Sequence, residues 1–381
     1  MQKVLIWDST GDSQKWCETH LEKNEVEVVA TITPLEPVPK ILLENDAWDW
    51  LLIFEKKMRS LFDTTIQALK LPVKKIIYAL DANSWSQNPK AIYTLLKESA
   101  RGWMHRKFLF NSCRELNTFF TCTVEDLSYI ATSADPFRMP HMFINRVNWA
   151  SNDMKRFHEL AQKYYHIDDS AGYFLDLGAN IGTTGLYFLK KLTPNLRLLA
   201  FEPDRENYKM HRLNMILNDL DDITYLVNCG LGNEVNELTL YSNGANPGQI
   251  GFIKLKNSKP ISTVKVIPLD AFIAANKIPA HDVKYIWIDT EGFEAKVLLG
   301  AKNLLKENPA PIFMECNLKA WDESGHFEDM MTLLSESYSH FVHFYKGEKL
   351  YPLEALRTME RPNNDLGQIG DIFLIKRGAI D

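Results

Sequence analysis

Four short segments of the sequence place acidic or amide side chains directly after apolar runs. They are Phe174–Gly185, Phe201–Asp204, Trp287–Glu294 and Phe313–Asn317. Each apolar run predicts a buried strand, and the polar residues that follow would emerge at its carboxyl end. In open α/β sheets, ligands bind in the crevice outside these ends. The four segments therefore predict one ligand site at one edge of a sheet.

The first segment combines a carboxylate with a glycine-bearing turn. Asp176 precedes Gly178, Asn180 and Gly182. Glycine lacks the Cβ atom that would keep a ligand away from the backbone. The spacing differs from the GxGxxG pattern of dinucleotide-binding domains, because Asn180 stands where a second glycine is expected. An acid before the turn suits an ammonium group and opposes a diphosphate.

The second segment ends in another acid, Glu202. In a βαβ unit, an acidic residue at the end of the second strand can accept both ribose hydroxyls. Asp176 and Glu202 together therefore suit a ligand with an adenosine-like ribose and a cationic group. S-adenosylmethionine has a ribose, an ammonium and a sulfonium but no phosphate, so it meets this description. NAD meets half of it.

The third and fourth segments add Asp289, Glu291, Glu294 and Glu315. Carboxylates buried without partners are destabilising, so we expect cationic ligand groups or hydrogen-bond donors to meet them. Glu294 falls on the first turn of the predicted next helix, where the helix dipole favours an acid. We interpret Glu294 as structural, and Asp289 and Glu291 as parts of the site.

Two stretches of alternating strands and helices must position these residues. The pattern predicts a smaller Rossmann-like α/β domain over residues 1–100 and a mostly parallel, doubly wound sheet over residues 167–381, with a β-excursion at residues 237–270. In the N-terminal domain the first turn keeps a single glycine, Gly11, beside the carboxylate Asp12. We therefore expect packing, assembly or substrate recognition there, and the surface could serve a homodimer.

Residues 101–166 predict a linker and capping helices. Their aromatic residues, among them Trp149 and Phe157, could line a pocket or fill a core. The Asp135-Pro136 and Met139-Pro140 steps disfavour helix before each proline, so we expect an irregular loop there.

Composition narrows the class of protein. The chain has 381 residues, with 43 Lys and Arg against 49 Asp and Glu, a net charge of −6 that disfavours nucleic acid as a partner. The five cysteines form no CxxC pair, which favours a reducing, cytoplasmic location without a zinc or disulfide framework. No apolar run approaches the ~18 residues of a membrane span, and no metal-ligand spacing is evident.

With these segments in hand, the C-terminal half resembles the FkbM family of S-adenosylmethionine-dependent methyltransferases. The resemblance runs from about Tyr173 to Gly300 and rests on the order FLDLGANIG, AFEPD and IDTEGFE. It implies a class I methyltransferase domain with a Rossmann-like fold and S-adenosylmethionine as cofactor. The residues that it implies for cofactor binding are Asp176, Gly178, Asn180, Gly182, Glu202 and Asp289.

The resemblance also implies a reaction. The family is associated with O-methylation of hydroxyls on sugars and polyketide-type products, so we expect in-line methyl transfer to a hydroxyl of a sugar, a glycan precursor or a related small molecule. In this architecture the fourth strand ends beside the sulfonium, which makes Asp289 or Glu291 the expected base and Glu315 the third candidate. An NAD-dependent oxidoreductase and a non-catalytic binding or scaffold protein remain alternatives.

Overall fold

The computed structural model describes residues 119–168, 170–242, 250–347 and 349–380, together with Arg106, Phe110, Asn111, Arg114 and the backbone of four N-terminal strands. The chain divides into two compact units. The first comprises Met1–Thr118 and Phe143–Asn145, and the second comprises Phe119–Met142 and Arg146–Asp381. The domain limits predicted at residues 100 and 166 stay predictions.

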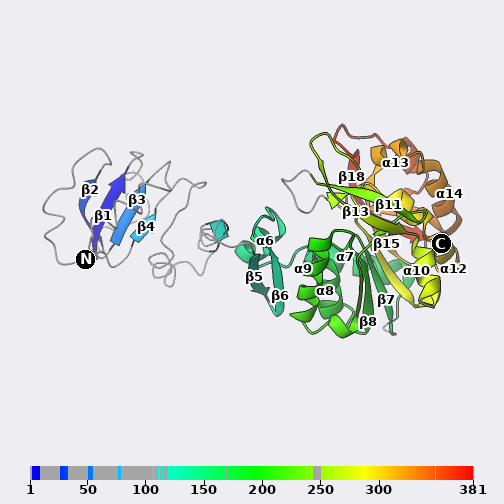
Figure 1. Ribbon diagram of the computed structural model, residues 1–381, viewed down its shortest axis with the longest axis horizontal. Helices are drawn as coiled ribbons and strands as arrows, with labels where there is room; N and C mark the ends of the chain where they lie inside the picture. Colours follow the sequence, from blue (N-terminus) through cyan, green and yellow to red (C-terminus); the bar gives the residue numbers. More distant parts are fainter. Residues whose placement is uncertain are drawn as a thin grey trace. The chain divides into compact units, whose positions relative to one another are not determined.

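The first unit contains a four-stranded parallel sheet (Figure 1). Its strands are β1 (Gln2–Asp8), β2 (Val26–Ile32), β3 (Trp50–Phe54) and β4 (Ile76–Tyr78), in the order β2-β1-β3-β4. These are the strands that the apolar runs predict. The predicted helices between them and the turn after β1 lie outside the described residues.

The second unit is built on an eight-stranded sheet with the order β17-β16-β18-β15-β14-β7-β8-β9. Five neighbouring strands are parallel: β7 (Gly172–Leu177), β8 (Leu196–Phe201), β9 (Thr224–Val227), β14 (Val283–Ile288) and β15 (Ile312–Asn317). Three antiparallel strands extend the sheet: β16 (Tyr338–His343), β17 (Leu350–Pro352) and β18 (Gln368–Lys376). The mostly parallel sheet is confirmed.

Helices follow the parallel strands and cover the sheet (Figure 1). They include α8 (Thr183–Lys191) after β7, α9 (Arg205–Ile216) after β8, α11 (Glu294–Leu299) and α12 (Lys302–Glu307) after β14, and α13 (Leu318–Glu323) and α14 (Phe327–Ser337) after β15. Three shorter or flanking helices are α6 (Arg138–Pro140), α10 (Leu269–Ala275) and α15 (Ala355–Thr358). No described helix is long and apolar enough to cross a bilayer.

One further helix, α7 (Ser151–Tyr165), precedes the sheet in sequence and packs against β18 and α8. Its Phe157 is 0% exposed and contacts the rings of Trp287 and Phe313 edge-on. Those two rings belong to neighbouring strands and stack on each other with centroids 3.4 Å apart. Phe157 therefore belongs to the core, which decides between the two roles left open for it.

A smaller sheet forms the predicted β-excursion. It comprises β10 (Gly230–Leu231), β11 (Asn236–Ser242), β12 (Ile250–Gly251) and β13 (Lys259–Ile267), in the order β10-β13-β11-β12. A Cβ atom on Gly251 would lie 3.1 Å from Cβ of Glu291. The small sheet thus lies against the turn that follows β14.

A β-hairpin stands where the aromatic pattern predicts capping helices. It consists of β5 (Phe119–Val124) and β6 (Leu127–Thr132). Every second residue of β6 is buried, which is the period of a strand. The spacing of the aromatic residues in this segment does not show that alternation. The side chains of Asn214 on α9 and of Asn218 just after it hydrogen-bond to backbone groups of Ser128 and Ile130. Amide side chains thereby satisfy one edge of β6 in place of a neighbouring strand.

Candidate active site

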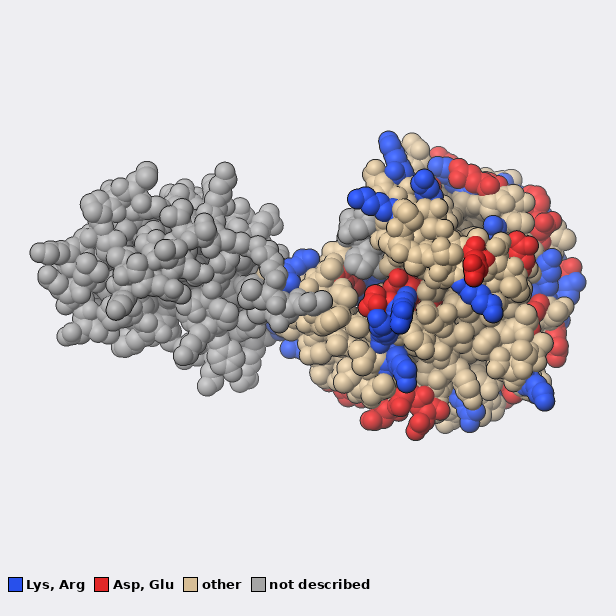
Figure 2. Space-filling view, in the orientation of Figure 1, with Lys and Arg blue, Asp and Glu red and all other residues tan. Residues whose placement is uncertain are grey.

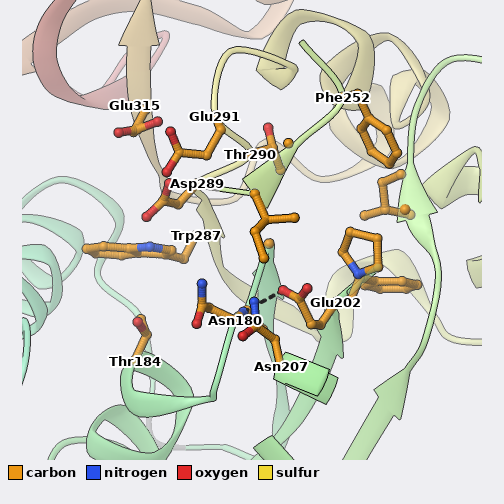
Figure 3. A pocket seen from close by; sticks show the side chains of 18 of the residues that line it. Asn180, Thr184, Glu202, Asn207, Phe252, Trp287, Asp289, Thr290, Glu291 and Glu315 are labelled. Carbon is orange, nitrogen blue, oxygen red and sulfur yellow. Dashed lines mark hydrogen bonds between the residues drawn. The ribbon is translucent and has the colours of Figure 1, made fainter. Parts of the chain in front are cut away.

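The carboxyl ends of β7, β8, β14 and β15 border a cavity of ≈ 390 Å³ (Figure 3). Six of the eight predicted site residues line it: Gly178, Asn180, Glu202, Asp289, Glu291 and Glu315. Because parallel strands end at the same edge of the sheet, segments that are far apart in the sequence meet here. Asp176 and Gly182 are not among the lining residues.

The turn after β7 is held close to the end of β14. Gly178 has a φ of 94°, and a Cβ atom there would lie 1.9 Å from the backbone oxygen of Asp289. The N–H groups of Gly178 and Ala179 both donate to the carbonyl of Phe201, each at 3.0 Å. Only glycine fits this turn without moving the neighbouring strand.

Gly182 packs tightly against a buried side chain, and the cofactor contact that the resemblance implies for it stays a prediction. A Cβ atom on Gly182 would lie 2.3 Å from the ring of His211, which is 0% exposed. Neither ring nitrogen of His211 has a hydrogen-bond partner among the described residues, and burial lowers the pKa of the imidazole to about 3. The buried ring leaves no room for a Cβ atom at position 182, so the turn requires glycine there.

Asp176 also lies beneath the turn and is 1% exposed. Its Oδ2 atom has no hydrogen-bond partner among the described residues. Burial and the nearby charge of Asp289 raise the pKa of Asp176 to about 7. The contact with a ligand that the resemblance implies for Asp176 stays a prediction, since its side chain does not reach the cavity surface.

Glu202 is positioned by the backbone. One carboxylate oxygen accepts the N–H group of Asn180 at 2.8 Å (Figure 3), and the other accepts the N–H group of Asp204 at 2.7 Å. Burial raises the pKa of Glu202 to about 8, although these two donors oppose the rise. Each oxygen keeps a lone pair that can accept a further hydrogen bond from a ligand hydroxyl.

Asp289, Glu291 and Glu315 gather beside Trp287, across the cavity from Glu202 (Figure 3). Asp289 lies deep in the unit but is open to the cavity; burial, with the charge of Glu294, raises its pKa to about 6. A hydrogen bond from Glu315 opposes this rise. Burial and neighbouring carboxylates raise the pKa values of Glu291 and Glu315 well above the usual range. The proton of this cluster is therefore held more readily by Glu291 and Glu315 than by Asp289.

Glu294 has a different function. Its Oε1 atom accepts from the backbone N–H groups of Thr290 and Gly292 and from the Thr290 hydroxyl, at 3.0 to 3.1 Å. Its Oε2 atom accepts from Trp321 at 2.8 Å and from Asn317 at 3.3 Å. Glu294 fixes the turn that presents Asp289 and Glu291, which agrees with its structural interpretation but assigns the effect to hydrogen bonds as well as to the helix dipole.

Two further residues line the cavity: Arg138, which the sequence does not indicate, and Trp149, for which the sequence leaves a pocket and a core role open. Arg138 donates through Nη1 to the Oδ1 atom of Asn180 at 2.5 Å. Arg138 lies in the stretch predicted as an irregular loop. The prolines on either side of Arg138 mark a turn, but nothing in the local sequence indicates which side chain reaches the site.

A second cavity of ≈ 630 Å³ adjoins the first. The residues common to both linings are Trp149, Thr184, Trp287, Asp289, Glu315 and Gln368. The second lining adds Tyr345 and Asp371. Burial raises the pKa of Asp371 to about 7, and a hydrogen bond from Tyr345 opposes the rise. Aromatic rings and carboxylates thus line the second cavity as well, which meets the first at Asp289.

Within the described residues, no group of three or more His, Cys, Asp and Glu side chains is arranged to hold a metal ion. Three cysteines in that part of the chain, Cys122, Cys229 and Cys316, are buried free thiols.

Comparison with known proteins identifies the domain. Residues 176–340 match the methyltransferase FkbM domain. Similar solved structures include an FkbM methyltransferase from Methylobacillus flagellatus KT, which is 12% identical over 98% of this chain and 90% of that chain, with a TM-score of 0.36. A SAM-dependent O-methyltransferase from Thermotoga maritima is 10% identical over 68% and 77%, with a TM-score of 0.31. The curated proteins yield no match. These structural likenesses are weak, so the assignment depends on the family match.

Proposed function

We propose that this S-adenosylmethionine-dependent methyltransferase, whose residues 176–340 match the methyltransferase FkbM domain, methylates a hydroxyl of a sugar or of a sugar-containing precursor. The family match decides against the NAD-dependent oxidoreductase. Measurable turnover would decide against a non-catalytic scaffold.

The residues of the first cavity fit the cofactor. Glu202 presents lone pairs suited to ribose hydroxyls. Gly178, which has no Cβ atom, lets the neighbouring turn approach the end of β14 closely. At the other side, Asp289 is short of positive charge, as its raised pKa shows. A cationic ligand would relieve that shortage. When bound, S-adenosylmethionine supplies a methyl group carried on a positively charged sulfonium.

We assign the proton acceptor to Asp289. With its pKa raised only to about 6, Asp289 is ionised at neutral pH, and the hydrogen bond with Glu315 favours that ionised form. Asp289 also lines both cavities, so it can reach a hydroxyl that enters from the second. Removal of a proton by a placed base typically contributes about 10² to 10⁴ in rate.

The second cavity carries the acceptor proposal. Its walls combine the rings of Trp149, Trp287 and Tyr345 with the carboxylates of Glu315 and Asp371. Aromatic faces pack against the C–H faces of a sugar ring, and carboxylates accept its hydroxyl protons. The single observation that supports a sugar acceptor most is therefore this aromatic and acidic chamber, which opens onto Asp289.

The test is a screen of free sugars, nucleotide sugars and lipid-linked sugars with methyl-labelled S-adenosylmethionine. We expect a labelled methyl on an acceptor oxygen, located by mass spectrometry and NMR. Trp149→Ala should lower kcat/KM for the acceptor at least tenfold, because it removes one aromatic wall. Tyr225→Ala, at an exposed position outside both cavities, is the matched control. Label on nitrogen or carbon, or on non-sugar acceptors alone, would contradict the proposal.

A further inference from the structure

One cation stands in a cavity otherwise rich in carboxylates. Among the described residues that line the first cavity, Arg138 is the only Lys or Arg. Its side chain is 11% exposed, so the guanidinium lies largely out of solvent. A buried cation is stabilised only when anions or acceptors surround it. We propose that Arg138 binds the carboxylate of the cofactor's methionine group.

The guanidinium is held at the glycine turn by groups on both of its sides. Nη1 donates to Oδ1 of Asn180, whose own backbone N–H donates to Glu202. Nε lies 3.7 Å from the carboxylate of Asp135. The other oxygen of Asp135 accepts the backbone N–H groups of Phe137 and Arg138, each at 2.9 Å. The position of Arg138 is therefore fixed independently of a ligand.

The guanidinium retains donors for a ligand. The hydrogen bond to Asn180 is the one that its terminal nitrogens make within the described part of the chain, so Nη2 has no protein acceptor there. An arginine presents N–H groups in a planar fork that matches a carboxylate with two parallel hydrogen bonds. The free donors thus suit a carboxylate better than a hydroxyl.

The charges of the ligand and the site fit one orientation. The methionine group carries an ammonium and a sulfonium, which Asp289 can meet. Its carboxylate would be repelled by Asp289. The guanidinium is the described cation that can receive the carboxylate, and it lies at the same turn as Asn180. The ligand's ammonium and carboxylate would then face opposite charges in one cavity.

Arg138 precedes residues 176–340, so the family match assigns it no function. A segment outside the matched domain would thus complete the cofactor site. An anionic group on the acceptor would offer Arg138 the same chemistry, and the experiment separates the two sources.

The experiment compares S-adenosylmethionine with its decarboxylated form, which keeps the ribose, sulfonium and amine. Calorimetry measures both dissociation constants for the wild type, Arg138→Gln and Arg138→Lys. A charge-assisted hydrogen bond contributes about 1.5 to 3 kcal/mol, or roughly ten- to hundredfold in affinity. We expect Arg138→Gln to weaken S-adenosylmethionine binding at least tenfold and to leave the decarboxylated form as tight or tighter. Arg138→Lys should recover part of the loss.

Arg146→Gln is the matched control. Arg146 lies in the same segment, donates to the backbone of Thr123 and does not line the cavity. It should change neither dissociation constant, and thermal melting should show that all three variants are folded. If Arg138→Gln weakens both ligands by the same factor, Arg138 only supports the turn through Asn180 and the inference is wrong. If it changes neither, the arginine does not contact the cofactor, and the inference is equally wrong.

Discussion

At the scale of single residues, the carboxylates of the site differ by their partners. Glu202 accepts two backbone N–H groups. Glu294 accepts hydrogen bonds from the turn after β14, from Asn317 and from Trp321, and Asp289 has a hydrogen bond with Glu315 that lowers its pKa. Glu202 thus keeps two lone pairs for a ligand, Glu294 keeps none, and Asp289 can act as an ionised base. The residue type alone does not reveal this division.

Asp289→Asn should reduce turnover by about 10² to 10⁴, the usual loss for a missing base. Because a base must be ionised, wild-type kcat/KM should fall as the pH drops below about 6, the value to which burial raises the pKa of Asp289. A bound cation would lower the pKa of Asp289 and move this fall in kcat/KM, the acidic limb of the pH profile, to a lower pH. In Asp289→Asn the acidic limb should be absent.

Glu291→Gln is the companion variant, and we expect at least a tenfold loss of turnover with cofactor affinity retained. Unchanged turnover would remove Glu291 from the mechanism. A retained acidic limb in Asp289→Asn would transfer the proton acceptor to another carboxyl, with Glu315 as the nearest candidate.

At the scale of elements, two strand-to-helix turns build the site against each other. The turn after β7 presses Gly178 onto the carbonyl of Asp289, at the end of β14. The turn after β14 is tied by Glu294 from the first position of α11. Moving either turn displaces the other, so the geometry of the site depends on the tight approach of the two turns.

Gly178→Ala tests that dependence. The added Cβ would lie 1.9 Å from a backbone oxygen at a φ of 94°, so the turn must shift. We expect S-adenosylhomocysteine affinity to fall at least tenfold, measured by calorimetry. Gly325→Ala is the control, because its φ of 73° carries the same backbone strain and nothing lies within 4 Å of the new Cβ. Equal losses in the two variants would show that strain, not the approach of the turns, weakens binding.

At the scale of the molecule, charge is distributed unevenly. Over the face shown in Figure 2, acidic and basic side chains of the described residues are intermixed. Inside the second unit, the cavities concentrate carboxyls whose pKa values burial raises, among them Glu202, Asp289 and Asp371. The folded state therefore holds protons that the unfolded chain releases.

This difference makes stability depend on pH. Burial raises the pKa of Asp371 from 3.8 to about 7, so this group favours the folded state below about pH 4 and loses that contribution as the pH rises toward 7. The free energy of unfolding of Asp371→Asn, relative to that of the wild type, should therefore be higher at pH 8 than at pH 4.5. We expect this relative gain to be about 1 kcal/mol or more, since one pKa unit is worth about 1.4 kcal/mol. Urea unfolding at the two pH values measures the gain. An equal difference at both would contradict the raised pKa.

The sequence by itself determined the strands of the large sheet and the meeting of its polar ends. Alternating strand and helix patterns predict parallel strands, and parallel strands end at one edge. Asp289, Glu291 and Glu202 therefore had to lie at one site, wherever the rest of the chain ran. The small sheet at residues 237–270 was predictable for the same local reason.

The tertiary structure decided which of these residues face the cavity and what else joins them. Asp176 and Gly182 belong to the predicted motif, but Asp176 is buried against α8 and Gly182 packs against the ring of His211, so neither lines the cavity. Arg138 and Trp149 reach the cavity from a segment without a periodic pattern. Local spacing specifies the period of a helix or strand, whereas a contact between Arg138 and Asn180 depends on how a loop crosses the completed sheet.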